Sequence, residues 1–265
     1  MEIFSEISIK GQESIYTLVI NRPEKKNILS PLCLREIEAA LSDLSTKSDL
    51  KVLVIRGGGD EAFCAGYDMA ALPSSEDEFP LDALDKIPPL EKALSAIESF
   101  PYPVLAMMNG YAYGGGCELA LSCDIRIAAR KVRMSMTALK IGLVYPYKGF
   151  ERFIRKIGLS STLEIFLTAK AYTSEECLRM GLVNAVVEDE DLEEYTYELA
   201  ARIASYPQSA LKGTKRAIYT IGALQPIDDK AKAELEYYFK RSLLSQEHLA
   251  IRRAFLERKA RAKNN

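Results

Sequence analysis

Three consecutive glycines and a nearby glutamate are the residues of this chain whose types and spacing best fit a catalytic or binding site. They lie in YAYGGGCELALSCD, residues 111–124, where the glycines at 114–116 are followed by Glu118. Each glycine inside a helix or strand costs about 0.5–1 kcal/mol relative to alanine, so a run of three indicates that a bare backbone is needed. A glycine loop entering a helix leaves N–H groups that can hold a phosphate or an oxyanion.

The spacing favours an oxyanion over a phosphate. The stretch lacks GxGxxG spacing, and no Walker lysine follows the glycines. A second loop, FCAGYDM at 63–69, follows the strand-like KVLVIRG. Two such loops are the minimum for a two-donor oxyanion hole, in which each donor lowers the barrier by about 2.7–4 kcal/mol. Close packing of a helix on a strand is the alternative explanation for the glycines.

Glu118 has two possible roles in this stretch. It lies three residues beyond Gly115, about one helical turn, so it would sit beside the oxyanion site as a general acid or base. The alternative is a carboxylate favoured by the helix dipole, which contributes about 0.3–1 kcal/mol.

Residue usage excludes several kinds of site. His248 is the only histidine and falls in a polar helical pattern, QEHLAIRRAFLERK, that predicts a surface residue. The sequence therefore argues against a Ser-His-Asp or Cys-His system and against a multi-histidine metal centre. The five cysteines are scattered without a CxxC pair, which argues against disulfides or a zinc site and predicts small core residues. We expect no metal.

Composition limits the partners. A net charge of −2 gives no support for nucleic-acid binding. No stretch reaches the roughly 18 uninterrupted apolar residues of a membrane span, and the N-terminus does not have the pattern of a signal peptide. We therefore expect neither a nucleic-acid nor a membrane partner, and a cytoplasmic location.

The order of elements predicts an α/β fold. The chain opens with two alternating segments that predict a β-hairpin turning across Gly11 and Gln12. Ser30 as N-cap and Pro31 after it mark the start of an amphipathic helix. Strands and helices then alternate to about residue 190, and the pattern is helical from Leu192. Further segments are predicted as strands at 51–57 and 104–108, helices at 90–99 and 117–123, and a mobile acidic segment at 74–89.

FCAGYDM and NGYAYGGGCELALSCDIRIAA resemble the crotonase (enoyl-CoA hydratase/isomerase) superfamily. NRPEKKNILS and LTAKAYTSEECLRMGLVNAVV support the resemblance, which spans essentially the whole chain. It implies a ClpP/crotonase-like ββα spiral core over 1–190 with a C-terminal helical region over 191–265. It also implies an acyl-CoA thioester substrate and no cofactor beyond that coenzyme A. The N–H groups of Tyr67 and Gly115 would bind the thioester carbonyl as it becomes an enolate.

The second glutamate of the ordinary hydratases is missing. Its position in that family corresponds to Ala138, which cannot transfer a proton. Glu151 and Glu164 lie in predicted helices and are expected to face solvent. Ala138 therefore argues against a standard two-carboxylate hydratase and against an isomerase that relies on that glutamate.

The surrounding segment, MSMTALKIGLVYPYKG, resembles the methylmalonyl-CoA decarboxylase branch of the superfamily. Thr137, Tyr145 and the retained Glu118 match that branch, whereas Tyr67 stands where the branch has histidine. Decarboxylation needs an oxyanion hole and a substrate carboxylate that is held out of the thioester plane. The Tyr145 hydroxyl can hold that carboxylate. Ala138 avoids a second negative charge beside that carboxylate.

The resemblance also implies coenzyme A contacts and an assembly. The contacts would be the phosphates by lysines, the adenine by an alanine, and a neighbouring subunit's coenzyme A by the C-terminal helix. These residues are Lys25, Lys26, Ala65, Asp68, Arg258 and Lys259. A homotrimer or a hexamer made of two trimers is expected, with helices around 231–245 as candidate contact surface.

Three alternatives remain open. A hydratase, isomerase or dehydratase could use Glu118 alone. A decarboxylase could act on an acyl-carrier-protein thioester. A binding protein without catalysis could share the fold. The acyl group is not fixed by the sequence, because segment 74–89 would line part of its pocket.

Overall fold

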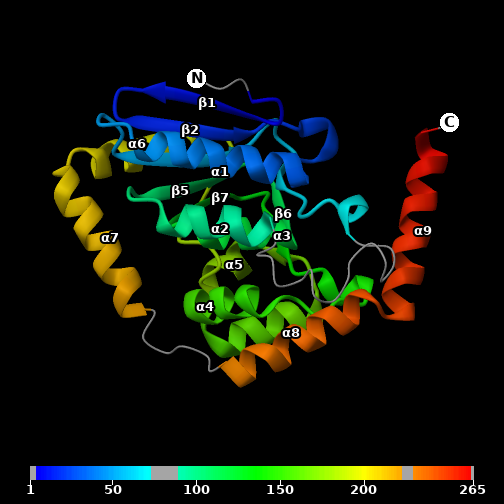
Figure 1. Ribbon diagram of the computed structural model, residues 1–265. Coiled ribbons are helices and arrows are strands. Elements are labelled where there is room, and N and C mark those ends of the chain that lie inside the picture. The colour runs from blue at the N-terminus through cyan, green and yellow to red at the C-terminus, as the bar shows by residue number, and fades with distance from the viewer. Residues whose placement is uncertain (1–3, 73–88, 223–228, 264–265) are drawn as a thin grey trace.

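The computed structural model describes residues 4–72, 89–222 and 229–263, and its strands form two sheets (Figure 1). The larger sheet has six strands in the order β1-β2-β3-β5-β7-β10, and the smaller has four in the order β4-β6-β8-β9. All neighbouring pairs are parallel except β1 with β2 and β8 with β9. The strands of the larger sheet are β1 Ile7–Gln12, β2 Ile15–Ile20, β3 Val52–Gly57, β5 Val104–Met108, β7 Ile125–Ala129 and β10 Ala185–Val187. Those of the smaller sheet are β4 Ala62–Cys64, β6 Tyr111–Tyr113, β8 Arg133–Ser135 and β9 Tyr172–Thr173.

The helices connect and cover these sheets. In chain order they are α1 Pro31–Ser45, α2 Pro89–Ser99, α3 Gly115–Ser122, α4 Tyr147–Thr168, α5 Ser174–Met180, α6 Leu192–Ala204, α7 Gln208–Gly222, α8 Asp229–Leu243 and α9 Gln246–Lys263. α4 is interrupted at Gly158, whose φ of 74° and ψ of 168° are not helical. In the part of the chain that the structure describes, no helix has the length and apolar content needed to cross a membrane.

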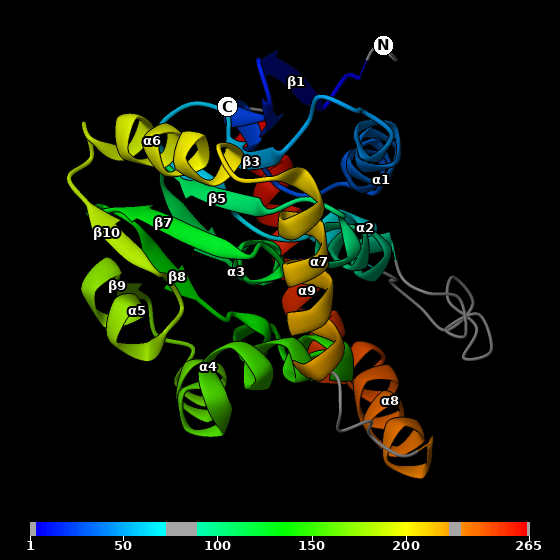
Figure 2. The same cartoon turned by 90° about the vertical axis from the view of Figure 1, so that its left-hand side faces the viewer.

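A ββα unit repeats three times, as β3–β4–α2, β5–β6–α3 and β7–β8–α4. In each unit the first strand joins the larger sheet and the second joins the smaller one. This arrangement confirms the predicted α/β spiral of the crotonase type. After β10 the described residues form only helices. Of these, α6 packs on the larger sheet, whereas α7 and α9 lie on opposite sides of the sheets (Figures 1 and 2).

The start of α1 follows its sequence signals. The Ser30 hydroxyl accepts a hydrogen bond from the Cys33 N–H at 3.0 Å, and Pro31 occupies the first turn. The helix buries its apolar face, formed by Leu34, Ile37, Leu41 and Leu44.

The hairpin was predicted correctly, but its turn was placed wrongly. Gln12 pairs with Ile15, so the turn consists of Glu13 and Ser14, and Glu13 has a φ of 52°. Gly11 instead lies inside β1 opposite Tyr16. A Cβ atom at Gly11 would lie 2.6 Å from a Tyr16 ring carbon, so this glycine makes room for an aromatic ring rather than for a turn.

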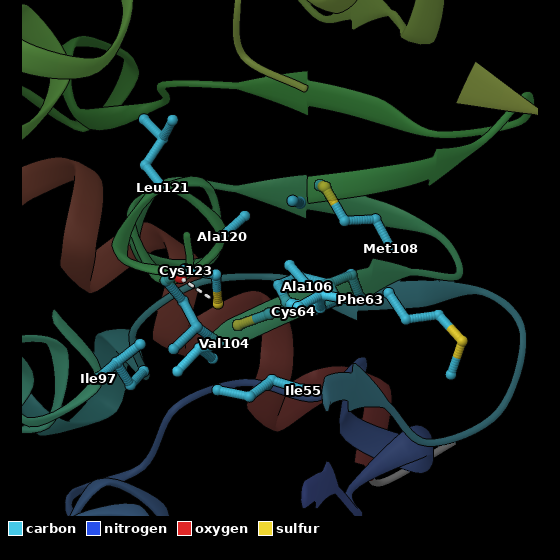
Figure 3. Packing of buried hydrophobic residues seen from close by; sticks show 14 of the residues in the cluster. Ile55, Phe63, Cys64, Ile97, Val104, Ala106, Met108, Ala120, Leu121 and Cys123 are labelled. Atoms are coloured by element: carbon cyan, nitrogen blue, oxygen red, sulfur yellow. Dashed lines mark hydrogen bonds between the residues drawn. The ribbon is translucent and has the colours of Figure 1, made fainter. Parts of the chain in front are cut away.

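The core lies between the sheets and the helices that follow them. Figure 3 shows side chains from α2, α3, β3, β4 and β5 packed together, among them Ile55, Phe63, Cys64, Ile97, Val104, Ala106 and Leu121. Burial of each large aliphatic side chain contributes about 1.5–3 kcal/mol. All five cysteines are buried and unpaired, as predicted. Residues 74–88 of the acidic segment that was expected to be mobile lie outside the described residues, and Pro89 begins α2.

Candidate active site

Two loops meet where the parallel strands β4 and β6 end. Gly66 and Tyr67 follow β4, whereas Gly114 and Gly115 follow β6. The Gly66 backbone has a φ of +102°, and a Cβ there would lie 2.7 Å from the Tyr113 carbonyl oxygen. The two loops are therefore in backbone contact, and only glycine fits at Gly66.

The backbone donors of the two loops lie close together. A Cβ at Gly115 would lie 3.3 Å from the Tyr67 nitrogen. The segment around Leu29 uses the groups on either side of Tyr67, because the Leu29 N–H donates to the Gly66 oxygen and the Asp68 N–H donates to the Leu29 oxygen. Among the described residues, neither the Tyr67 nor the Gly115 N–H has a hydrogen-bond partner. Both donors are thus available at one place, as an oxyanion hole requires.

The three glycines serve three different purposes. Gly114 has a φ of +52°, which permits the turn into α3. Gly115 leaves open the space beside the Tyr67 N–H. Gly116 packs α3 on β4, since a Cβ there would lie 2.1 Å from the Cys64 carbonyl oxygen. α3 begins two residues earlier than predicted, and close packing accounts for one glycine rather than for all three.

Glu118 is buried on α3 with both carboxylate oxygens engaged. Its side chain is 3% exposed. Oε2 accepts a hydrogen bond of 2.5 Å from the Tyr145 hydroxyl, and Oε1 accepts one from Nη1 of Arg152. Burial raises the pKa of Glu118 above its ordinary value, although the charge of Arg152 and the hydrogen bond from Tyr145 oppose the increase.

Tyr145 lies just before α4 and packs between aromatic rings. Its ring centroid is 5.5 Å from that of Phe166 and 6.3 Å from that of Phe150. Gly149 makes room for it, because a Cβ there would lie 2.3 Å from a ring carbon. Burial and the neighbouring Glu118 raise the pKa of Tyr145 well above its ordinary value, so the hydroxyl keeps its proton. The structure thus brings Tyr145 and Glu118 together.

Arg152 was not found by sequence reasoning. It lies on α4, and its guanidinium contacts three glutamates: Glu118 on α3, and Glu91 and Glu98 on α2. Burial lowers the pKa of Arg152, but the hydrogen bond to Glu98 and the charges of the three carboxylates raise it above its ordinary value. No sequence pattern singled it out, because its three carboxylate partners lie on other helices.

The position of the missing second glutamate is apolar. Ala138 is 8% exposed and clusters with Leu143 of its own loop and Leu243 of α8. Glu164 is exposed, as predicted. The prediction for Glu151 was wrong, because its side chain is only 14% exposed and lies between two cations of its own helix, Lys148 and Arg155. These side chains hold it by i,i+3 and i,i+4 contacts.

Thr137, Lys26 and Ala65 are further predicted site residues. Thr137 precedes the short 3-10 turn that carries Ala138, and its Oγ1 would lie 3.4 Å from a Cβ at Gly114. Lys26 adjoins Ala65, because the Ala65 N–H donates to the Lys26 carbonyl at 3.0 Å.

Other contacts occupy several of these polar groups. The Lys26 ammonium pairs with Glu61, and Lys25 beside it is exposed. The Asp68 carboxylate accepts the Ala70 N–H at 3.0 Å and so caps a 3-10 turn. Arg258 and Lys259 are exposed on α9.

The prediction that His248 lies on the surface was wrong. The side chain is fully buried, and its Nδ1 lies 2.6 Å from the Ile141 carbonyl oxygen at the end of the Ala138 turn. One helical turn further along, the Arg252 guanidinium donates to the carbonyls of Met69, Ala70 and Leu72. α9 thereby contacts both the loop after Tyr67 and the loop after Thr137. The i,i+4 spacing of these two residues in an otherwise polar helix was the only signal in the sequence.

A ββα spiral with two free backbone donors beside one buried acid is the class of fold and site seen in crotonases. The family model for enoyl-CoA hydratase/isomerase matches residues 10–261, and the chain belongs to this family.

Two of the similar proteins are named for different reactions. Crotonyl-CoA hydratase of Syntrophomonas wolfei is 34% identical over 216 residues, 81% of each chain. Methylmalonyl-CoA decarboxylase of Escherichia coli is 27% identical over 257 residues, 97% of each chain. A solved structure of methylmalonyl-CoA decarboxylase complexed with 2S-carboxypropyl CoA has a TM-score of 0.89 at 27% identity, with 97% of both chains covered. Similarity to the decarboxylase thus extends over more of the chain, whereas identity to the hydratase is higher.

Proposed function

We propose that this protein decarboxylates a malonyl- or methylmalonyl-type coenzyme A thioester through an enolate held by the N–H groups of Tyr67 and Gly115. The observation that carries the proposal is the apolar setting of Ala138, where a hydratase would hold its second carboxylate. The similarity to methylmalonyl-CoA decarboxylase over 97% of both chains supports it.

The reaction follows from these groups. The bond between the α-carbon and the substrate carboxylate breaks, its electron pair enters the thioester as an enolate, and CO2 leaves. The two N–H groups stabilise the enolate oxygen, each lowering the barrier by about 2.7–4 kcal/mol. A proton then adds to the α-carbon, and Glu118 is the buried acid placed to supply it. The Tyr145 hydroxyl donates its single proton to Glu118 Oε2 in this structure. With substrate bound it would turn to the departing carboxylate, which frees Oε2 to carry the proton.

The proposed site includes contacts that bind the rest of the substrate. Thr137 would line the acyl end beside Gly114. Lys25, Lys26, Ala65 and Asp68 would contact coenzyme A, together with Arg258 and Lys259 of α9. Coenzyme A itself is the only cofactor-like group that this proposal requires.

The test is a comparison of substrates. Incubation with malonyl-, methylmalonyl- and crotonyl-CoA, with the thioester products separated by chromatography, should show loss of CO2 from a malonyl-type thioester. Glu118→Gln should reduce any hydration by about 10²–10⁴-fold, because hydration needs the proton transfer. The same change should slow decarboxylation less, since that step depends chiefly on the backbone donors. A protein that hydrates crotonyl-CoA efficiently and ignores methylmalonyl-CoA would overturn the proposal.

A one-glutamate hydratase or isomerase is the second candidate. The 34% identity to crotonyl-CoA hydratase of Syntrophomonas wolfei favours it. In that case Glu118 would activate water alone, and Tyr145→Phe should change hydration by altering the hydrogen bond to Oε2. Under the decarboxylase proposal, Tyr145→Phe should chiefly reduce turnover of malonyl-type thioesters.

We also propose that the chain assembles as a trimer or as a hexamer of two trimers. The second half of α4 exposes three leucines at a spacing of four residues, namely Leu159, Leu163 and Leu167. Such a stripe is more apolar than a solvated helix face requires. Light scattering at micromolar concentration should give three or six chains, and a monomer would contradict the proposal.

A further inference from the structure

The contacts of Arg152 link the candidate acid to a second layer of charge. Its guanidinium lies between α2, α3 and α4, with a side chain only 4% exposed. Nε and Nη2 are 2.7 Å and 3.0 Å from the two oxygens of Glu98, and Nη2 is 3.3 Å from Glu91 Oε1. Nη1 faces Glu118 Oε1. Glu98 therefore binds the Nε and Nη2 edge of the planar guanidinium, while Nη1 faces Glu118.

These contacts leave Glu118 with one orientation. Because Arg152 holds Oε1, the other oxygen is directed to the Tyr145 hydroxyl at 2.5 Å. The carboxylate cannot rotate without breaking one of these bonds in a buried place.

The charges of the cluster do not balance. One guanidinium faces three carboxylates, so the positive charge is divided among them. The groups that act on Glu118 are Glu91 from α2, Arg152 from α4 and Tyr145 from the loop before α4. Burial raises the pKa of the thiols of Cys64 on β4 and Cys117 on α3, so both remain neutral. On β6, Tyr111 and Tyr113 stack on each other at 4.7 Å.

We propose that Arg152 is the positioning residue for Glu118, and that its division among three glutamates leaves Glu118 able to carry the proton that the enolate product needs. A cation paired with Glu118 alone would keep that carboxylate ionised, whereas removal of the cation would leave Glu118 protonated over a wider pH range. The inference rests on the proposed function only in assigning that proton to the enolate.

The test is a titration of Glu118 that does not depend on turnover. Carboxyl-labelled glutamate would be followed by carbon-13 NMR against pH, and the Glu118 signal would be assigned from its loss in Glu118→Gln. Arg152→Met should raise the titration midpoint of Glu118 by about one pH unit or more, and Arg152→Lys should raise it less. Glu91→Gln should move the midpoint in the opposite direction, because its charge favours the protonated form.

Arg155→Met is the matched control. This arginine lies one turn further along α4 and pairs with Glu151, with its side chain 45% exposed. It should leave the Glu118 midpoint unchanged. Equal midpoints in the parent, Arg152→Met and Glu91→Gln would overturn the inference, and if the arginine variants do not fold, an unmoved midpoint in Glu91→Gln alone would do so.

Kinetics separate this inference from the proposed function. If the parent converts methylmalonyl-CoA, the pH of half-maximal kcat should shift in the same directions as the midpoints, with partial recovery in Arg152→Lys relative to Arg152→Met. If the parent converts no malonyl-type thioester, the proposed function fails and the titration still decides the role of Arg152. A lower unfolding temperature with an unchanged pH profile would mean that Arg152 acts on stability alone.

Discussion

The two ends of the candidate site differ in whether backbone or side-chain groups form them. At the oxyanion end, formed by Tyr67 and Gly115, the groups that count are backbone N–H groups, and neighbouring glycines fix their position. At the acid end, formed by Glu118, Tyr145 and Arg152, the groups are side chains that hold one another through buried hydrogen bonds. A substitution that fills space should therefore impair the oxyanion end, and one that removes a charge should impair the acid end.

The largest effect is expected at the acid end. Arg152→Met leaves three carboxylates close together without their cation, and breaking a buried ion pair costs about 3–5 kcal/mol. Urea unfolding at neutral pH should show this loss in the free energy of unfolding. Arg155→Met, which removes a half-exposed arginine from its pair with Glu151, should change it by about 1 kcal/mol or less. Equal losses would mean that the buried network is no more important than a surface pair.

At the oxyanion end, Gly115→Val should abolish turnover without unfolding the protein. The added Cβ would lie 3.3 Å from the Tyr67 nitrogen, in the space that the thioester oxygen needs. Loss of one donor alone corresponds to about 2.7–4 kcal/mol, or 10²–10³-fold in kcat. Circular dichroism and the unfolding midpoint should stay close to those of Gly213→Ala, a glycine with open space around it on α7. Unchanged turnover would mean that Gly115 serves packing.

Ala138→Glu moves the acid end toward a two-carboxylate site. A second negative charge near the substrate carboxylate should reduce decarboxylation about tenfold, which corresponds to about 1.4 kcal/mol. The same variant should gain weak hydration of crotonyl-CoA, measured by loss of its enoyl absorbance. Ala138→Gln, of similar size but neutral, controls for volume. If it slows decarboxylation equally, bulk rather than charge is responsible.

The smallest effect is expected at the proposed coenzyme A contact. Lys26→Met removes an exposed charge that pairs with Glu61. The KM for the acyl-CoA substrate should rise several-fold while kcat stays the same, because both the ground state and the transition state lose the contact. Lys10→Met, which changes an exposed lysine on β1, is the control variant in the same steady-state measurements. A lower kcat with unchanged KM would contradict a binding role for Lys26.

The same difference explains what the sequence could reveal. The oxyanion end is local: Gly66 with Tyr67, and Gly114 with Gly115, are adjacent residues whose glycines stand out in the sequence. The alternation of the longer strands and helices was likewise predictable from their apolar periods, whereas the ββα spiral was expected only from the family resemblance. Glu118 was visible for the same reason, one turn after the glycines.

Contacts between distant elements were hidden. Arg152 joins helices whose residues are separated by up to 61 positions, and His248 reaches Ile141 across 107. His248 was assigned to the surface because the polar pattern of its helix outweighed its i,i+4 spacing with Arg252. Gly11 shows the same limit on a smaller scale, since its partner Tyr16 lies across the hairpin rather than beside it.

The contact of Arg252 has a consequence for how the protein is made. The carbonyl of Ala70, three residues after Tyr67, receives its hydrogen bond from a residue 182 positions later. During synthesis the loop after Tyr67 therefore waits for a further 182 residues to leave the ribosome before this partner arrives. A nascent chain could form its sheets early and still not hold this loop in its final position. The loop after Tyr67 would then reach its final position only when α9 docks against it.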